Sequence, residues 1–278
     1  MEIIHVLILS IVEGITEFLP ISSTGHMILA SKVLNIPQTD FVKSFEIIIQ
    51  SGAILSVIVL YTKTVLSNPN LFKKTIIAFI PTGIIGLTLY RIIKDILIGN
   101  IIITLISLLI GGVLIIAIEL YFKSKSQVTP TVARQRPRLL PGGNEQDNHT
   151  KTLENLTYKQ ALIIGIFQSI SIIPGVSRAA ATIIGGLFTG LNRSSAVEFS
   201  FLLAIPTMLA ATGYDLLKNA SSFSPDQAKI LALGFFASFM TSFIVVRWFL
   251  SFIKNHTFIP FGIYRIALAI LFFLLFLR

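Results

Sequence analysis

The feature that most constrains the fold is a set of apolar stretches, each about as long as a bilayer is thick. The clearest stretch runs from Ile101 to Phe122, and Glu119 is its only charged residue. A helix needs about 20 predominantly apolar residues to cross the hydrocarbon core of a membrane. Of the 278 residues, 54% are hydrophobic and 13% are charged, whereas a soluble domain is about 25% charged. The sequence therefore predicts an all-α, polytopic membrane protein.

The charge and cysteine content exclude several classes of function. The formal net charge is +9, and the chain has no cysteine. In a membrane protein, basic residues gather in short loops, where they set the orientation and meet anionic lipid. We therefore expect a membrane partner and no nucleic acid, and we exclude disulfides and thiolate chemistry. The apolar N-terminus lacks a basic region and a cleavage site, so we interpret it as retained structure and not as a signal peptide.

Two pairs of short helices are each interrupted by a proline. Broken backbone at membrane depth is tolerated only where it is buried or lines a wet cavity, so each pair predicts a re-entrant hairpin. A polar segment separates the two halves of the chain, and its composition predicts a flexible cytoplasmic linker. The expected elements are a hairpin at 1–34, spans at 44–61, 75–90 and 100–122, the linker at 123–156, a hairpin at 157–190, and spans at 195–217, 228–252 and 258–277.

The two halves resemble each other. Pro20 and Pro174 differ by an offset of 154, which aligns Ser23 with Ser177. Each half, 1–122 and 157–278, holds one hairpin and three spans. Because three is odd, the halves should have opposite orientations, which is the inverted-topology repeat of many transporter folds. The distribution of basic residues predicts that the linker is cytoplasmic and that both termini lie outside.

Polar side chains converge around the first break. Glu13 and Glu17 are four residues apart, so they share one helix face. An ionisable residue at bilayer depth costs about 2.5–3.5 kcal/mol and usually marks a site. The pair could be satisfied by backbone groups or by an arginine, could carry protons or ions in a transporter, or could hold a divalent metal shared with phosphates. After Pro20 the chain continues with Ser22, Ser23, Thr24, Gly25 and His26.

Two of these residues are candidates for the chemical step. His26 could be a helix-start histidine satisfied by its neighbours, but among Glu, Ser and Arg it is a better candidate for general acid/base or nucleophile work. Ser23 is the alternative nucleophile, with His26 as its activator three residues on. The sequence does not decide between them.

The second break predicts an anion site. Arg178 follows Pro174, Gly175 and Ser177, and a snorkelling role suits it poorly because it lies between two apolar half-helices. Guanidinium binds phosphate bidentately, and the helix start offers free N–H groups. Ser177 and Thr182 add hydroxyls, and two facing anion sites suit a diphosphate. A last group either lines the cavity or only supports the packing and the membrane interface: Glu46, Gln50, Glu198, Tyr264 and Arg265.

Five motifs resemble, in order and over nearly the whole chain, those of the bacterial undecaprenyl-diphosphate phosphatases, the bacitracin-resistance family. They are EGITEFLPISSTGHM, FEIIIQSGAI, PGVSRAAATIIGGLFTG, EFSFLLAIP and IPFGIYR. The resemblance implies a hydrolase of the bacterial cytoplasmic membrane that converts the C55 polyprenyl diphosphate to the monophosphate carrier used in cell-wall synthesis. It also implies an active site at the two breaks that opens to the outer face.

The resemblance assigns roles residue by residue. The acidic motif falls on Glu13 and Glu17, which would hold a divalent cation, Mg²⁺ or Ca²⁺. The serine–histidine motif falls on Ser22, Ser23, Thr24 and His26, and the arginine motif falls on Ser177, Arg178 and Thr182. Gly25 and Gly175, within the same two segments, are also expected to bind the substrate.

The chain departs from the family pattern in two places. Ala179 stands where members usually have serine, and the segment from Ser124 to Leu156 is longer than expected. The rival hypothesis is a transporter or flippase of a phosphorylated polyprenol, because architecture does not carry function. The sequence does not fix the oligomeric state, and a homodimer is among the partners that we consider.

Overall fold

The computed structural model describes residues 1–89, 100–127, 152–219 and 223–276, and all regular structure in these residues is helical. This confirms the predicted all-α class. The described residues form ten α-helices and two short 3₁₀ turns, η2 (Leu153–Asn155) and η3 (Ile170–Ile172). The α-helices are α1 (Ile3–Thr16), α2 (Ser23–Val33), α3 (Asp40–Ser67), α4 (Pro69–Thr88), α6 (Ile101–Gln127), α8 (Tyr158–Ser169), α9 (Arg178–Phe188), α10 (Arg193–Asn219), α11 (Pro225–Ile253) and α12 (Ile259–Phe276).

Six of these helices are long and apolar enough to cross a membrane, which confirms a multi-pass membrane protein. They are α3, α4, α6, α10, α11 and α12, whereas α1 and α9 are apolar but shorter. Several run beyond the predicted spans: α3 begins at Asp40 and ends at Ser67, where 44–61 was expected. Hydropathy detects the part of a helix inside the hydrocarbon, whereas the helix itself continues through polar residues to its caps, here Thr39 and Asn68.

Regular structure extends into both ends of the expected linker, 123–156. Helix α6 continues to Gln127, and Leu153–Asn155 form a 3₁₀ turn followed by the buried Leu156. Residues 128–151, on which the predicted flexibility falls, lie outside the described residues, as do the expected loop at 91–99 and the predicted span ends at Tyr90 and Leu277. Within the predicted hairpin at 1–34, α1 ends at Thr16, because the backbone does not stay helical up to Pro20.

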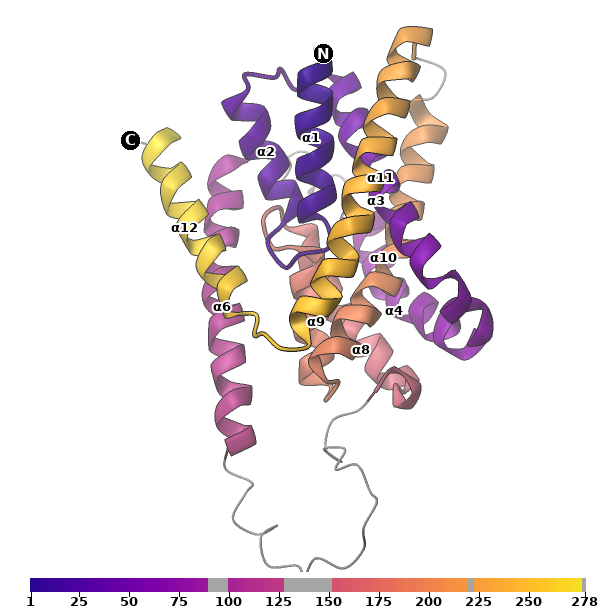
Figure 1. The fold of residues 1–278 in the computed structure, drawn as a ribbon, viewed down its shortest axis with the longest axis vertical. Helices are drawn as coiled ribbons and strands as arrows, with labels where there is room; N and C mark the ends of the chain where they lie inside the picture. The colour runs from indigo at the N-terminus through magenta and orange to yellow at the C-terminus, as the bar shows by residue number, and fades with distance from the viewer. Residues whose placement is uncertain (90–99, 128–151, 220–222, 277–278) are drawn as a thin grey trace, which may run out of the picture.

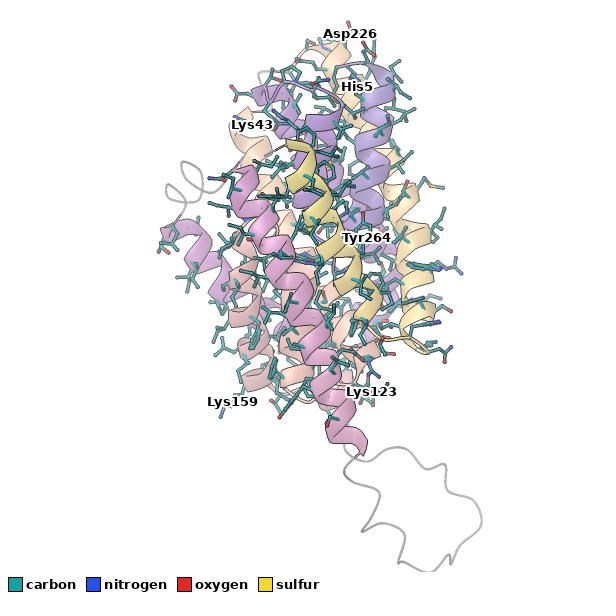
Figure 2. The ribbon with its side chains drawn as sticks, turned by 90° about the vertical axis from the view of Figure 1, so that its left-hand side faces the viewer. His5, Lys43, Lys123, Lys159, Asp226 and Tyr264 are labelled. Carbon is teal, nitrogen blue, oxygen red and sulfur yellow. The ribbon has the colours of Figure 1, made fainter. Side chains whose placement is uncertain are left out.

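Both termini lie at one end of the bundle, and the end of α6 and the start of α8 lie at the other (Figure 1). The pairs α1–α2 and α8–α9 enter from these opposite ends and meet at their breaks. Figure 2 places His5, Lys43 and Asp226 at the first end and Lys123 and Lys159 at the second, with Tyr264 between the two ends. The breaks therefore lie between the two polar ends of the molecule.

Each hairpin begins with a helix that packs tightly, through a glycine, on a helix of the other half. Helix α1 packs on α11, and α8 packs on α4. A Cβ atom at Gly14 would lie 2.7 Å from Thr241 Cβ, and one at Gly165 would lie 2.0 Å from the carbonyl oxygen of Ala78. A hydroxyl donates to each glycine carbonyl, Ser242 to Gly14 at 3.0 Å and Thr82 to Gly165 at 3.2 Å. These contacts fix both hairpins against the long helices.

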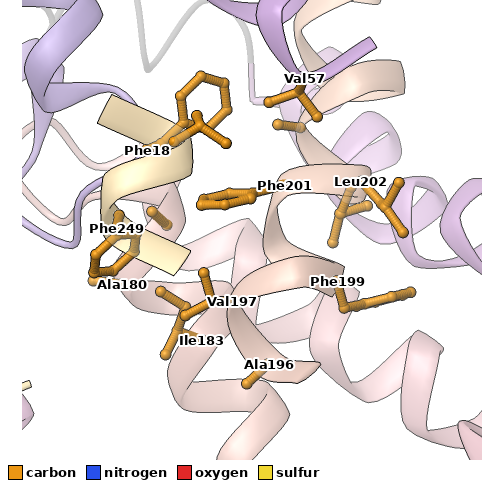
Figure 3. Close-up of a cluster of buried hydrophobic side chains, with 14 of the residues drawn as sticks. Phe18, Val57, Ala180, Ile183, Ala196, Val197, Phe199, Phe201, Leu202 and Phe249 are labelled. Carbon is orange, nitrogen blue, oxygen red and sulfur yellow. The ribbon is translucent and has the colours of Figure 1, made fainter. Parts of the chain in front are cut away.

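An aromatic core lies directly behind the first break (Figure 3). Phe18 follows Glu17 in the chain and is fully buried. Its ring packs edge-on against Phe201 of α10, with centroids 5.2 Å apart, and Phe201 in turn contacts Phe249 of α11. Between membrane helices, such ring packing stabilises the fold through close van der Waals contact. The polar residue Glu17 is therefore anchored by the apolar residue that follows it.

Candidate functional site at two helix breaks

The first break is built by a serine in an unusual backbone conformation. Proline lacks an N–H group, so Pro20 ends the helical pattern, and the next helix begins at Ser23. Ser22 caps α2 with φ +73°, and its Oγ accepts a hydrogen bond from the Gly25 N–H at 3.3 Å. A positive φ is uncommon for a residue with a side chain and points to a functional constraint. The break thus presents the N-terminus of α2, where N–H groups favour an anion.

The second break repeats this backbone. Ser177 caps α9 with φ +75°, and its Oγ accepts a hydrogen bond from the Ala180 N–H at 3.2 Å. The structural counterpart of Ser177 is therefore Ser22, and the alignment of Ser177 with Ser23 is wrong by one residue. The second break has one more residue between its proline and its cap, and Gly175 within it adopts φ +90°. In this register the counterpart of Arg178 is Ser23.

The two breaks are joined by a three-residue polar contact. Ser23 Oγ donates to Glu17 Oε2 at 2.5 Å, and Arg178 Nη2 donates to Glu17 Oε1 at 3.0 Å. Glu17 and Arg178 are largely buried, with 4% and 11% of their side chains exposed. The structure therefore brings together Glu17 from the turn after α1, Ser23 from α2 and Arg178 from α9.

The hydrogen bonds of Arg178 leave its Nε without a partner. Its Nη1 donates to the Ser200 carbonyl at 3.0 Å, whereas its buried Nε has no hydrogen-bond partner. Thr182, which was expected to face a phosphate, instead donates to Ser200 Oγ at 2.6 Å one turn into α9. Ser200 thus supports both residues, and it is a site residue that sequence reasoning missed. Its motif, EFSFLLAIP, was recognised, but a single serine in an apolar helix gives no signal of its own.

Glu13 is fully buried, and neither oxygen of its carboxyl group has a hydrogen-bond partner. Burying an ionised carboxylate is costly unless it is paired or binds a metal. Glu17 lies one helical turn further on. Within the residues that the structure describes, no group of three or more His, Cys, Asp or Glu side chains could hold a metal ion. Glu13 and Glu17 therefore offer two hard oxygen donors, and a bound cation would need its remaining ligands from phosphate or water.

His26 faces away from Ser23. Its Nδ1 lies 2.7 Å from the Ser22 carbonyl oxygen, and its Nε2 lies 2.7 Å from the Tyr264 hydroxyl. Because a carbonyl only accepts, we assign the proton to Nδ1, which leaves Nε2 as the acceptor of the Tyr264 O–H. The Ser23 hydroxyl therefore donates its hydrogen bond to Glu17 and not to His26, which was expected to activate it.

The remaining candidates lie around these contacts. Thr24 is exposed in the first turn of α2, and Gly25 follows it, where a Cβ atom would lie 3.3 Å from Ser22 Oγ and 3.5 Å from Leu108. Glu46 accepts hydrogen bonds from Ser31, near the C-terminal end of α2, and from Gln38, in the segment that follows it. Tyr264 and Arg265, left open by the sequence, both reach the breaks: Tyr264 contacts His26, and Arg265 contacts the backbone of each break.

Comparisons with known proteins cover nearly all of the chain. A family model described as bacitracin resistance protein BacA matches residues 6–271. A protein of Aquifex aeolicus named undecaprenyl-diphosphatase is 48% identical over 270 residues, which are 97% of each chain. Proteins of the same name from Sulfurihydrogenibium sp. and Persephonella marina are 47% and 46% identical, over 99% of each chain. The chain therefore belongs to the bacitracin resistance protein BacA family.

Proposed function

We propose that this protein is an integral membrane phosphatase that hydrolyses undecaprenyl diphosphate to undecaprenyl phosphate and phosphate. Its family and the shared name of its relatives support this activity, and with it a role in cell-wall synthesis and bacitracin resistance. The observation that carries the proposal is the contact of Glu17, Ser23 and Arg178 between two helix N-termini. That arrangement supplies an anion site, a hydroxyl and a carboxylate at one point.

We further propose an inverted-topology repeat, with residues 1–122 and 157–278 as its halves, 123–156 as the connecting segment and each hairpin re-entrant. The matching caps at Ser22 and Ser177 and the reciprocal packing of α1 on α11 and α8 on α4 support it. In this arrangement the termini lie outside the cell, and the site opens towards that face. Lys123 and Lys159 then lie at the cytoplasmic end, in agreement with the positive-inside rule.

The diphosphate would bind between the two breaks. The N–H groups that begin α2 and α9 favour negative charge, and Thr24, Gly25, Ser22, Ser177 and Gly175 belong to these same segments. Arg178 would bring its free Nε to a phosphate oxygen and stabilise the charge that spreads over the terminal phosphoryl group. Thr182 would act indirectly, because its hydroxyl is engaged with Ser200.

A divalent cation, Mg²⁺ or Ca²⁺, fits the unpartnered carboxylate of Glu13. Glu13 and Glu17 would hold the cation, which would supply charge neutralisation on the phosphates. Glu17 is then shared between the cation and Arg178, so it would fix the arginine relative to the metal site. Removal of the cation would leave two adjacent buried carboxylates, which repel each other.

Ser23 and His26 remain alternative nucleophiles. Attack on the terminal phosphorus would break its bond to the bridging oxygen and release undecaprenyl phosphate, and water would then free phosphate from the enzyme. In the Ser23 route, Glu17 is placed to accept the hydroxyl proton. In the His26 route, Nε2 is the attacking atom, and Tyr264 must release it. Rapid quenching distinguishes the routes, because a phosphohistidine is acid-labile and a phosphoserine is not.

Phosphate release from purified protein tests the proposal. We expect release from undecaprenyl diphosphate that requires Mg²⁺ or Ca²⁺ and is lost in Arg178→Ala. Replacing Arg247, an exposed arginine on α11, by alanine is the matched control and should leave release unchanged. Binding of the lipid without any release by folded wild type would contradict the phosphatase and favour the transporter of a phosphorylated polyprenol.

A further inference from the structure

Arg265 on α12 is the largest side chain in the described residues with no exposed surface. Its guanidinium donates five hydrogen bonds, all to backbone carbonyls. Nε donates to Leu108 at 3.3 Å, Nη1 to Pro20 at 3.2 Å and Val176 at 3.0 Å, and Nη2 to Ser107 at 3.0 Å and Gly175 at 2.8 Å. An arginine has five N–H donors. Every donor is therefore used.

The five acceptors belong to three separate segments. Pro20 is in the first break, Gly175 and Val176 are in the second, and Ser107 and Leu108 are on α6. Within the part of the chain that the structure describes, no carboxylate lies within ion-pair distance of Arg265. Burying an unpaired charge costs several kcal/mol. The five hydrogen bonds to backbone carbonyls offset that cost here.

The neighbouring helices are built to admit this side chain. A Cβ atom at Gly111 on α6 would lie 2.1 Å from Arg265 Nη2, and one at Gly112 would lie 2.7 Å from the Gly262 carbonyl. The two glycines of α6 thus let α12 approach closely enough for the guanidinium to reach the breaks. An arginine at the membrane interface would extend its guanidinium into water and would need no glycines on a neighbouring helix.

We propose that Arg265 is a positioning residue that holds the two helix breaks in register, so that the N-termini of α2 and α9 face one diphosphate. In a trans peptide the C=O and the following N–H point in opposite directions. With the Val176 carbonyl on Arg265, the N–H of Ser177 points away from the guanidinium, towards the side where Arg178 begins α9. This inference rests on the proposed phosphatase for its catalytic consequence, but the register itself does not depend on catalysis.

The first test replaces Arg265 by lysine, which keeps the charge but has three donors on one nitrogen. Amide hydrogen exchange should accelerate at peptides covering residues 20–25 and 173–180 while α3 and α11 keep wild-type protection. We expect kcat to fall about 10²-fold, the cost of misplacing reacting groups by about 1 Å, with KM within about threefold of wild type. Arg247→Lys, on the exposed face of α11, is the matched control and should change none of these values.

A second variant displaces the guanidinium without changing it. Gly111→Ala places a methyl group where Nη2 lies and should reproduce faster exchange at both breaks and the loss in kcat. Gly86→Ala is its control, because a Cβ atom at Gly86 would meet nothing within 4 Å. This pair keeps the inference testable if the lysine variant does not fold.

The outcomes separate this inference from the proposed function. Wild-type kcat and unchanged exchange in both Arg265→Lys and Gly111→Ala would overturn the positioning role. Exchange accelerated equally in all helices would also overturn it, because Arg265 would then support only the fold. If wild type releases no phosphate, the phosphatase fails, and the exchange measurement still decides whether Arg265 fixes the breaks.

Discussion

The breaks before α2 and α9 have closely similar backbones and carry different side chains. Ser22 and Ser177 have φ values of +73° and +75°, and each accepts a hydrogen bond from the N–H three residues on. The helices that follow both have 11 residues. The first break adds Glu17 and His26, whereas the second adds Arg178. The shared backbone offers two anion-attracting helix ends, and the side chains divide the chemistry between them.

The helices that precede the two breaks, α1 and α8, also carry different polar side chains at matching positions. Glu13 and Gln168 are both fully buried, and both have side-chain oxygens without a hydrogen-bond partner. They are separated by 155 positions, the same offset as Ser22 and Ser177. Gln168 donates to Thr82 and Thr207, on α4 and α10, so the second half uses a neutral amide where the first half has a carboxylate. One half is thereby suited to a cation and the other to an anion.

The largest expected effect concerns Arg178, whose counterpart in the first break is the uncharged Ser23. Arg178→Ala should reduce kcat by about 10³-fold or more, as does loss of an arginine that stabilises phosphoryl transfer. Arg178→Lys should still lose about 10²-fold, since the single nitrogen of lysine cannot bond Ser200, Glu17 and a phosphate oxygen from three separate positions as the guanidinium does. Phosphate-release kinetics measure both values. Near-wild-type activity of the lysine variant would show that a point charge is sufficient.

The next prediction replaces Glu13 by glutamine, the residue type of its counterpart in the second half, Gln168. Glu13→Gln should lower cation-dependent phosphate release by about 10²-fold, because metal stabilisation of a transferring phosphoryl group is worth several kcal/mol. The same variant should not lower the unfolding temperature in EDTA, because it removes an unpartnered buried charge. Added Mg²⁺ should raise the unfolding temperature of wild type and not of the variant. Full activity of Glu13→Gln would remove Glu13 from the cation site.

A smaller effect tests whether the two breaks are equivalent in their backbone. Ser22→Ala and Ser177→Ala each remove an N-cap, which costs about 1 kcal/mol of stability, and each leaves alanine at a positive φ. We expect equal falls in the unfolding temperature of the detergent-solubilised protein. Two clearly unequal falls would mean that the similar caps do not contribute alike. Ser67→Ala, at an exposed hydroxyl at the end of α3, serves as the control.

The smallest effect concerns His26, which has no counterpart in the second break. Tyr264→Phe keeps the ring stacked on His26 and removes one hydrogen bond, a loss of about 1 kcal/mol. We expect kcat to change by less than about tenfold, with a changed pH profile of kcat because the hydrogen bond to Nε2 is lost. Tyr121→Phe, at the exposed end of α6, should leave the profile unchanged. An unaltered profile in Tyr264→Phe would exclude its contact with His26 from the reaction.

The sequence by itself determined the membrane class, the approximate positions of six spans and the two breaks. Long apolar stretches have few alternatives in a bilayer, and proline, serine and glycine act on the backbone locally, so both signals are readable without tertiary contacts. The same locality explains why Glu13, Glu17, Ser23, His26 and Arg178 could be selected as candidates. Charged residues in apolar segments are costly, and their cost marks them before any partner is known.

Only the tertiary structure decided which of these residues meet. It paired Ser23 with Glu17 in place of His26, and it brought Arg178 to Glu17 across 161 positions of the chain. It also moved the register of the repeat by one residue and placed Arg265, for which the sequence left cavity and membrane interface open, against the backbone of both breaks. Hydrogen bonds between distant segments depend on how helices pack, and that packing leaves no periodic trace in the sequence.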